Sequence, residues 1–167
     1  DRIEALGANA VAIGSDGRNL HFTALALGRS AQTAGRYVRA DAAQGETRSH
    51  GFFYRASDDS SGMIGLPIIV GGESAAGQLR RAPAGVVFVR NQGLVFTEAG
   101  TLDASAVAAD DGCRASCVDW YGNARPLFLR GRVFALMGYE IVEGRVEAGG
   151  RIAESRRISF APREAAL

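Results

Sequence analysis

Short apolar runs separated by glycine-containing turns occupy almost the whole chain, and this pattern most restricts the fold. The 22 glycines are spread through the 167 residues and are not clustered. In Asn19–Leu27 apolar residues stand on both alternating faces, as in a strand that is at least partly covered on both sides. The preceding Ser15–Gly17 (SDG) predicts a tight hairpin turn, because glycine adopts positive φ without a clash. We therefore expect a protein built of short antiparallel strands.

The strand-like runs form three groups of about four, and each group recurs after roughly 45 to 55 residues. The approximate groups are 1–45, 46–105 and 106–162. One twisted four-stranded sheet cannot bury both of its faces, whereas sheets stacked around an axis can. The spacing predicts an all-β fold of the β-propeller type, with about three four-stranded antiparallel blades in a single region, 1–167. A β-sandwich of two sheets is the alternative.

Four polar stretches interrupt this pattern. Residues 28–35 (GRSAQTAG) and 41–49 (DAAQGETRS) are expected as breaks between strands, and Gly71–Pro83 as a loop of about a dozen residues. Residues 103–119 contain the best place for a helical turn, although they lack the i, i+3, i+4 apolar stripe of a packed helix. A further turn is expected at Leu129–Arg132 (LRGR).

Charge and hydropathy narrow the classes of partner. The formal net charge is +1, and all 19 basic residues are arginines, so no long-range attraction to nucleic acid or anionic lipid is expected. The hydrophobic content of 47% is typical of a globular protein. No apolar run approaches the roughly 18 residues that a membrane-spanning helix requires. We predict a folded domain with no nucleic-acid partner and no membrane span.

Three segments carry a resemblance to a known family. They are Gly45–Ile68 (GETRSHGFFYRASDDSSGMIGLPI), 85–102 (GVVFVRNQGLVFTEAGTL) and 124–144 (ARPLFLRGRVFALMGYEIVEG). Over about 42–160 the chain resembles secreted prokaryotic proteins with a C-terminal β-propeller domain distantly related to WD-repeat proteins. The resemblance implies the C-terminal blades of a longer protein, whose remaining blades are partners, and an extracellular or cell-envelope location. The family supplies no catalytic residue to carry over.

The segment around His50 contains the residue types of a hydrolytic site. Ser49 precedes it, and Asp58 and Asp59 follow. Adjacent side chains of a strand point to opposite faces, so Ser49 and His50 form a poor nucleophile–base pair, and there is no GxSxG motif. We expect His50 to hydrogen bond to backbone or to a neighbouring carboxylate at a strand edge, and Asp58–Gly62 to form a hairpin loop. A hydrolase that uses His50 with a nearby carboxylate is the alternative.

A second candidate site is a polar and aromatic cluster. Trp120, the only tryptophan, stands with Asp119, Tyr121 and Asn123. Such a cluster can bind a sugar or a peptide, and it can equally pack between blades. The acidic pairs of the chain lack the spaced DxDxDG pattern of a calcium loop. We predict no metal and no cofactor.

Cys113 and Cys117 (CRASC) allow three interpretations. A structural zinc site needs four ligands, and a redox pair normally has CxxC spacing, so neither fits well. Because the family resemblance implies export, a local disulfide between the two cysteines is favoured over two free thiols.

The predicted function is that of a non-catalytic β-propeller scaffold or binding module of a secreted or cell-envelope protein. Its ligand is expected to be a protein or a polysaccharide. The candidate binding residues are His50, Asp119, Trp120, Tyr121 and Asn123.

Overall fold

The computed structural model describes residues 2–70, 84–105 and 124–160, and these residues form an all-β protein. Within these ranges thirteen strands make three antiparallel sheets, and the single helix is a three-residue 3-10 turn, η1 (Ser49–Gly51). No helix of the described ranges is long and apolar enough to cross a membrane. The predicted all-β class is confirmed, with three sheets where a β-sandwich would have two.

The first and the last sheet are four-stranded meanders, in which each strand pairs with the next along the chain. The strands of the first sheet are β1 (Arg2–Leu6), β2 (Asn9–Ser15), β3 (Leu20–Leu27) and β4 (Ala31–Arg39). Those of the last sheet are β10 (Arg125–Leu129), β11 (Arg132–Met137), β12 (Glu140–Val146) and β13 (Ile152–Ser159).

The middle sheet has five strands, because two short strands share one edge. Its order is β5-β7-β8-β9, and β6 also pairs with β7, next to β5 along the same strand. Its strands are β5 (Ala42–Gln44), β6 (Phe53–Ala56), β7 (Ser61–Val70), β8 (Ala84–Gln92) and β9 (Val95–Asp103).

Two-residue turns with positive φ close two of the hairpins. Arg130 and Gly131 have φ of 49° and 76°, and Gly93 and Leu94 have φ of 58° and 70°. Such turns twist in the same sense as the strands that they join. The turn predicted at Leu129–Arg132 is confirmed. The predicted turn at Ser15–Gly17 is present but longer, since β3 begins only at Leu20.

Both polar breaks predicted before residue 50 are partly wrong. Residues 28–35 include the start of β4, which begins at Ala31, and residues 41–49 include β5 and η1. Both strands lie at a sheet edge. Backbone hydrogen bonds to one neighbour hold such a strand, so its side chains need not be apolar. The side chains of residues 31–34 are exposed.

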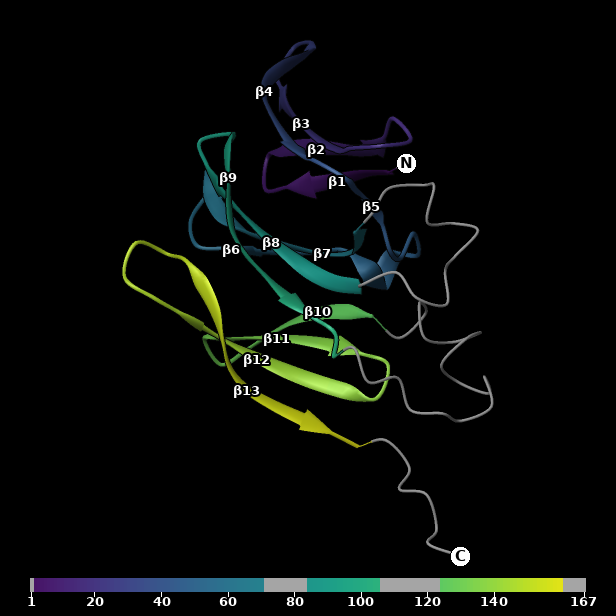
Figure 1. Ribbon diagram of the computed structural model, residues 1–167. Coiled ribbons are helices and arrows are strands. Elements are labelled where there is room, and N and C mark those ends of the chain that lie inside the picture. Colours follow the sequence, from purple (N-terminus) through teal and green to yellow (C-terminus); the bar gives the residue numbers. More distant parts are fainter. Residues whose placement is uncertain (1, 71–83, 106–123, 161–167) are drawn as a thin grey trace, which may run out of the picture.

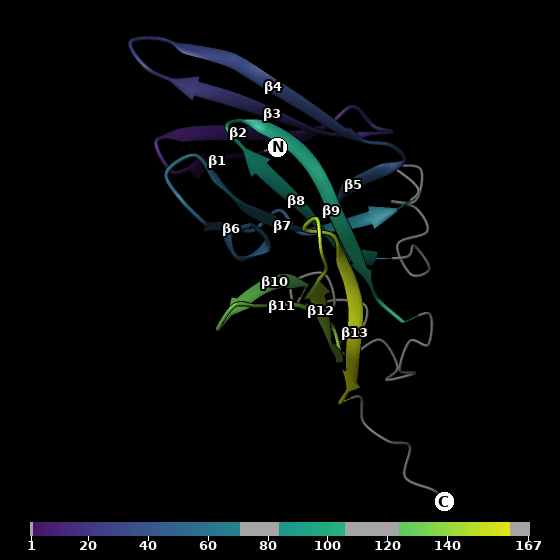
Figure 2. The ribbon, with the colours of Figure 1, turned by 90° about the vertical axis from the view of Figure 1, so that its left-hand side faces the viewer.

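The sheets are layered in chain order, so that the middle sheet lies between the other two (Figures 1 and 2). One apolar core joins the first and middle sheets and includes Phe22, Leu66 and Val87. A second core joins the middle and last sheets and includes Phe88 and Val133. Consecutive residues of β7 and β8 therefore enter different cores, and the middle sheet is buried on both faces.

Polar contacts join the last strands of the three sheets, β4, β9 and β13, along one edge. The guanidinium of Arg39 on β4 donates from Nη1 to Oε1 of Glu98 on β9 at 2.6 Å, and the Tyr37 hydroxyl donates to the other carboxylate oxygen. On β13, Arg157 donates from Nη2 to the carbonyl oxygen of Asp103 on β9 at 2.8 Å. These contacts fix the neighbours of β9 on both sides.

Candidate functional site

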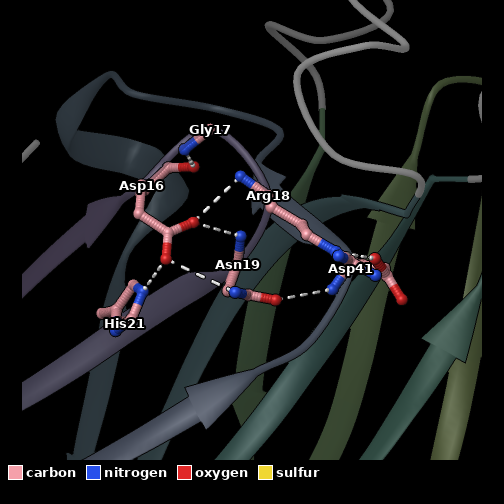
Figure 3. A network of polar contacts seen from close by, with 7 residues as sticks. Asp16, Gly17, Arg18, Asn19, His21 and Asp41 are labelled. Carbon is pink, nitrogen blue, oxygen red and sulfur yellow. Dashed lines mark hydrogen bonds and ion pairs between the residues drawn. The ribbon is translucent and has the colours of Figure 1, made fainter.

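The turn between β2 and β3 holds one of the two histidines against a carboxylate (Figure 3). Oδ1 of Asp16 accepts the backbone N–H of Arg18 at 2.9 Å and that of Asn19 at 2.7 Å. Oδ2 lies 2.8 Å from Nε2 of His21, the second residue of β3. Aspartate commonly folds such turns by accepting hydrogen bonds from the backbone that follows it. The sequence predicted a turn here but not the aspartate–histidine pair.

Hydrogen bonds lower the pKa of the Asp16 carboxyl well below its usual range. The largest contribution comes from the backbone N–H of Asn19, followed by His21 and by the backbone N–H of Arg18. Each donor stabilises the charged form. Asp16 is therefore an anion at any physiological pH, and its negative charge is held beside the His21 ring.

An open hollow of about 570 Å³ adjoins this turn on the first sheet. Its lining combines apolar and small residues with polar ones: Arg2, Ile3, Ala12, Ile13, Gly14, Ser15, Asp16, His21 and Thr23. The volume lies in the range of small-ligand sites. The hollow is wide open to solvent, however, and the His21 side chain is 40% exposed. It can receive an apolar group against its floor and offer His21 or Asp16 at its rim.

His50 lies in η1 and has a buried carboxylate beside it. Nε2 of His50 is 3.4 Å from Oε2 of Glu46, whose side chain is only 4% exposed. Oε1 of Glu46 accepts the backbone N–H of Arg48 at 2.7 Å and its side-chain Nε–H at 3.1 Å. The turn is tight, because a Cβ on Gly51 would lie 2.7 Å from Cγ of Glu46. The prediction that His50 lies at a strand edge is wrong, because β6 begins only at Phe53. His50 does lie beside a carboxylate, but one that the sequence analysis did not consider.

Two opposing effects set the pKa of Glu46. Burial disfavours the charged form, but hydrogen bonds from the side chain and backbone of Arg48 outweigh it, and the pKa stays below the ordinary value. Arg2 ties the same turn to β1, since its Nη2 donates to the carbonyl oxygens of Thr47 at 3.0 Å and Arg48 at 2.8 Å. The Glu46 carboxylate organises a connection between two sheets, which explains its burial without any chemistry.

The acidic hairpin after β6 folds as the sequence predicts. Oδ1 of Asp58 accepts the backbone N–H of Ser60 at 2.8 Å and its hydroxyl at 3.0 Å. These two bonds lower the pKa of Asp58. Asp58, one of the two aspartates considered as a partner of His50 in a hydrolytic site, is therefore hydrogen bonded within its own loop.

The remaining predicted site residues lie outside the described ranges. They are the aromatic cluster Asp119, Trp120, Tyr121 and Asn123, and the cysteines Cys113 and Cys117. The loop predicted at Gly71–Pro83 and most of the helical turn predicted within 103–119 lie outside them too. Within 2–70, 84–105 and 124–160, no three His, Cys, Asp or Glu side chains gather where they could hold a metal ion.

Comparisons of the chain with protein-family models, with curated proteins and with solved structures found no significant match.

Proposed function

We propose that the three sheets are consecutive blades of a β-propeller, and that the chain is a non-catalytic scaffold or binding module of a secreted or cell-envelope protein. Three features support the blades. The first and last sheets are meanders and the middle sheet continues as one from β7 to β9, the sheets follow one another in chain order, and equivalent strands meet across both interfaces. The edge strands β1 and β10 both contact β6, and the edge strands β4 and β13 both contact β9.

The observation that carries the proposal is the burial of the middle sheet on both faces. In a two-layered sandwich each sheet has one inner and one solvated face. In a propeller every blade lies between two others, so both faces of its central strands are apolar. Residues 62–69 of β7 and 85–89 of β8 are all buried, as this arrangement requires.

The ligand is proposed to be a protein or a polysaccharide, bound by residues that include Asp119, Trp120, Tyr121 and Asn123. To test this assignment, binding of soluble neutral and acidic polysaccharides to the chain is measured by biolayer interferometry. Trp120→Ala should weaken binding of any bound polysaccharide about tenfold or more, because a stacked aromatic side chain dominates such contacts. Tyr139→Ala, in a hairpin of the last sheet, is the aromatic control. Equal binding by both variants would contradict the assignment.

The two histidines offer a direct test against the hydrolase alternative. The chain is assayed with chromogenic ester, glycoside and peptide substrates, and we expect no turnover above that of buffer. Should turnover appear, it is measured again in His50→Ala and in the matched variant His21→Ala. Turnover that His50→Ala abolishes and His21→Ala retains would overturn the proposal of a non-catalytic module.

A further inference from the structure

On the side away from the middle sheet, the last sheet has an apolar face that no other described part of the chain covers. Pairing across β10, β11, β12 and β13 places two rows of side chains there. The rows are Leu127-Phe134-Glu143-Arg156 and Arg125-Leu136-Ile141-Ile158. Apolar residues fill most of the central positions of these two rows, and Ile158 is 49% exposed. Three charged residues, Arg132, Glu143 and Arg145, also lie on the central strands of this face, and Glu143 is paired with Arg132 at 2.6 Å.

The outer face of the first sheet, which no other described residues cover, has a different character. One row across it is Ile3-Ala12-Thr23-Arg36, and the neighbouring rows place Ala10 and Gly14 on β2. The residues of β2 on this face are small, with His21 and Leu25 on β3 as the larger neighbours, and the hollow of about 570 Å³ opens over Ala12, Gly14 and Thr23. A bulky face at one end of the molecule and a hollowed, small-residue face at the other are complementary in shape.

Glycines let the sheets approach closely at the interfaces inside the chain. A Cβ added to Gly65 of β7 would lie 2.4 Å from Cβ of Pro126 in β10, and a Cβ added to Gly35 of β4 would lie 2.4 Å from the Leu94 carbonyl oxygen. The middle sheet meets the last sheet through the face opposite to the one that meets the first sheet. If a further sheet packs on the last sheet in the same way, the face that it presents should be equivalent to the outer face of the first sheet.

We propose that the outer face of the last sheet binds the outer face of the first sheet of a second copy of this chain. The association is head-to-tail, with Phe134, Leu136 and Ile141 directed at the hollow beside Ala12 and Thr23. Such an interface uses two different surfaces, so copies form a ring if the rotation between them closes and a filament if it does not. The inference rests on the stacking of the sheets and does not require that they are propeller blades.

Two variants separate a head-to-tail interface from other kinds of self-association. Leu136→Glu introduces a charge on the last sheet opposite Arg125, and Thr23→Glu introduces one on the first sheet opposite Arg36. Each new carboxylate has an arginine across the strand pair, so the single chains should remain folded. Molar mass is measured by size-exclusion chromatography with light scattering from about 5 to 500 μM. The wild-type mass should rise above the 17.5 kDa of one chain, to a constant multiple of it for a ring and continuously with concentration for a filament.

Mixing the two variants gives the decisive result. Each variant alone should remain a monomer, because one of its two faces carries a new charged side chain that the interface would have to bury. The mixture should form a one-to-one dimer and nothing larger, because one intact face of each kind remains. A monomeric wild-type chain at every concentration would overturn the proposal. So would an oligomer that only one of the two substitutions disrupts, since that result indicates a like-with-like interface.

A second pair of variants protects the test against misfolding. Ile158→Glu and Val38→Glu lie on the same two faces at positions that are 49% and 47% exposed, where a charge is tolerated by the folded chain. Circular dichroism and thermal unfolding should match the wild type for both. The pair should reproduce the monomers and the mixed dimer, and failure of this folded pair to do so would overturn the proposal.

Discussion

The middle sheet and the two outer sheets are all antiparallel, but they differ in what covers their faces. Among the described residues, the middle sheet packs against a neighbour on each side, whereas the first and last sheets each pack on one side only. The central strand β7 shows the consequence, because its eight residues 62–69 are all buried. In β11 buried residues alternate with partly exposed ones.

This difference indicates that the contribution of a side chain to the free energy of unfolding depends on whether one or both faces of its sheet are buried. Substitutions of equal size should destabilise the chain most in the middle sheet, where a side chain has protein on all sides. On an outer face the same change removes few contacts. Substitutions at four positions test this contrast between the middle sheet and the outer faces, and Phe88 should show the largest effect.

The largest loss of stability is expected for Phe88→Ala in the middle sheet. Phe88 is fully buried and packs edge-on against Phe128 of the last sheet, with the ring centroids 6.0 Å apart. Removing the ring leaves a cavity in the second core, so the free energy of unfolding should fall by about 3–5 kcal/mol. Ile158→Ala on the outer face should cost less than about 1 kcal/mol. Urea unfolding is measured at a concentration where the chain is monomeric, and similar losses for the two variants would refute the contrast.

The next largest effect is expected where two sheets approach most closely. Gly65→Ala places a methyl group 2.4 Å from Cβ of Pro126, on the opposite sheet. The sheets must separate locally, and we expect a loss of about 1–3 kcal/mol from overpacking. Gly28→Ala is the matched control, because a Cβ there has no atom within 4 Å. It should change the free energy of unfolding by less than about 0.5 kcal/mol in either direction. A destabilisation shared by both variants would indicate backbone strain and not the sheet contact.

The sequence predicted the sheets better than it predicted their edges. Apolar residues located central strands such as β3, where the buried positions alternate, and β7, where burial on both faces gives a continuous apolar run. It missed β5 and the start of β4, since strands at a sheet edge are held by backbone hydrogen bonds and need no apolar side chains. A pattern of hydrophobicity cannot detect pairing that depends on the backbone alone.

The polar sites were less accessible to sequence reasoning than the fold. The Asp58 loop was predicted correctly because the hydrogen bonds that the Asp58 carboxylate accepts come from Ser60, two residues away. His50 was expected beside a carboxylate, but Glu46 was overlooked, although the two stand four residues apart as an acid–base pair would in a helical turn. The pairing of Glu98 with Tyr37 and Arg39 joins residues about sixty positions apart, and no local signal indicates it.

Tyr37→Phe tests one of the polar contacts between the first and middle sheets. Burial, and then the neighbouring Glu98, raise the pKa of the Tyr37 hydroxyl far above its ordinary value of 10.0. Loss of the hydroxyl should cost about 1 kcal/mol near pH 7. Above pH 10 the unfolded chain loses the Tyr37 proton while the folded chain keeps it, so the hydroxyl's contribution falls as pH rises. The difference between wild type and variant, from urea unfolding at pH 7 to 11.5, should therefore shrink above pH 10. A constant difference would contradict the role of Glu98.

The smallest effect is expected at the exposed turn of the first sheet, in Asp16→Asn. Asparagine can still accept the backbone bonds of Arg18 and Asn19, but it lacks the charge that faces His21. Because the folded-state pKa of Asp16 is lowered, its contribution is complete above the ordinary value of 3.8 and is lost progressively as pH falls from there toward the folded-state pKa. Wild type should exceed the variant in stability at pH 7, and the difference should shrink as pH is lowered to 2. Asp41→Asn, which removes an exposed ion pair with Arg18, should have little effect at either pH.

A difference in stability between wild type and Asp16→Asn that is the same at pH 7 and pH 2 would mean that the Asp16 charge contributes nothing. The turn would then depend on hydrogen-bond geometry alone.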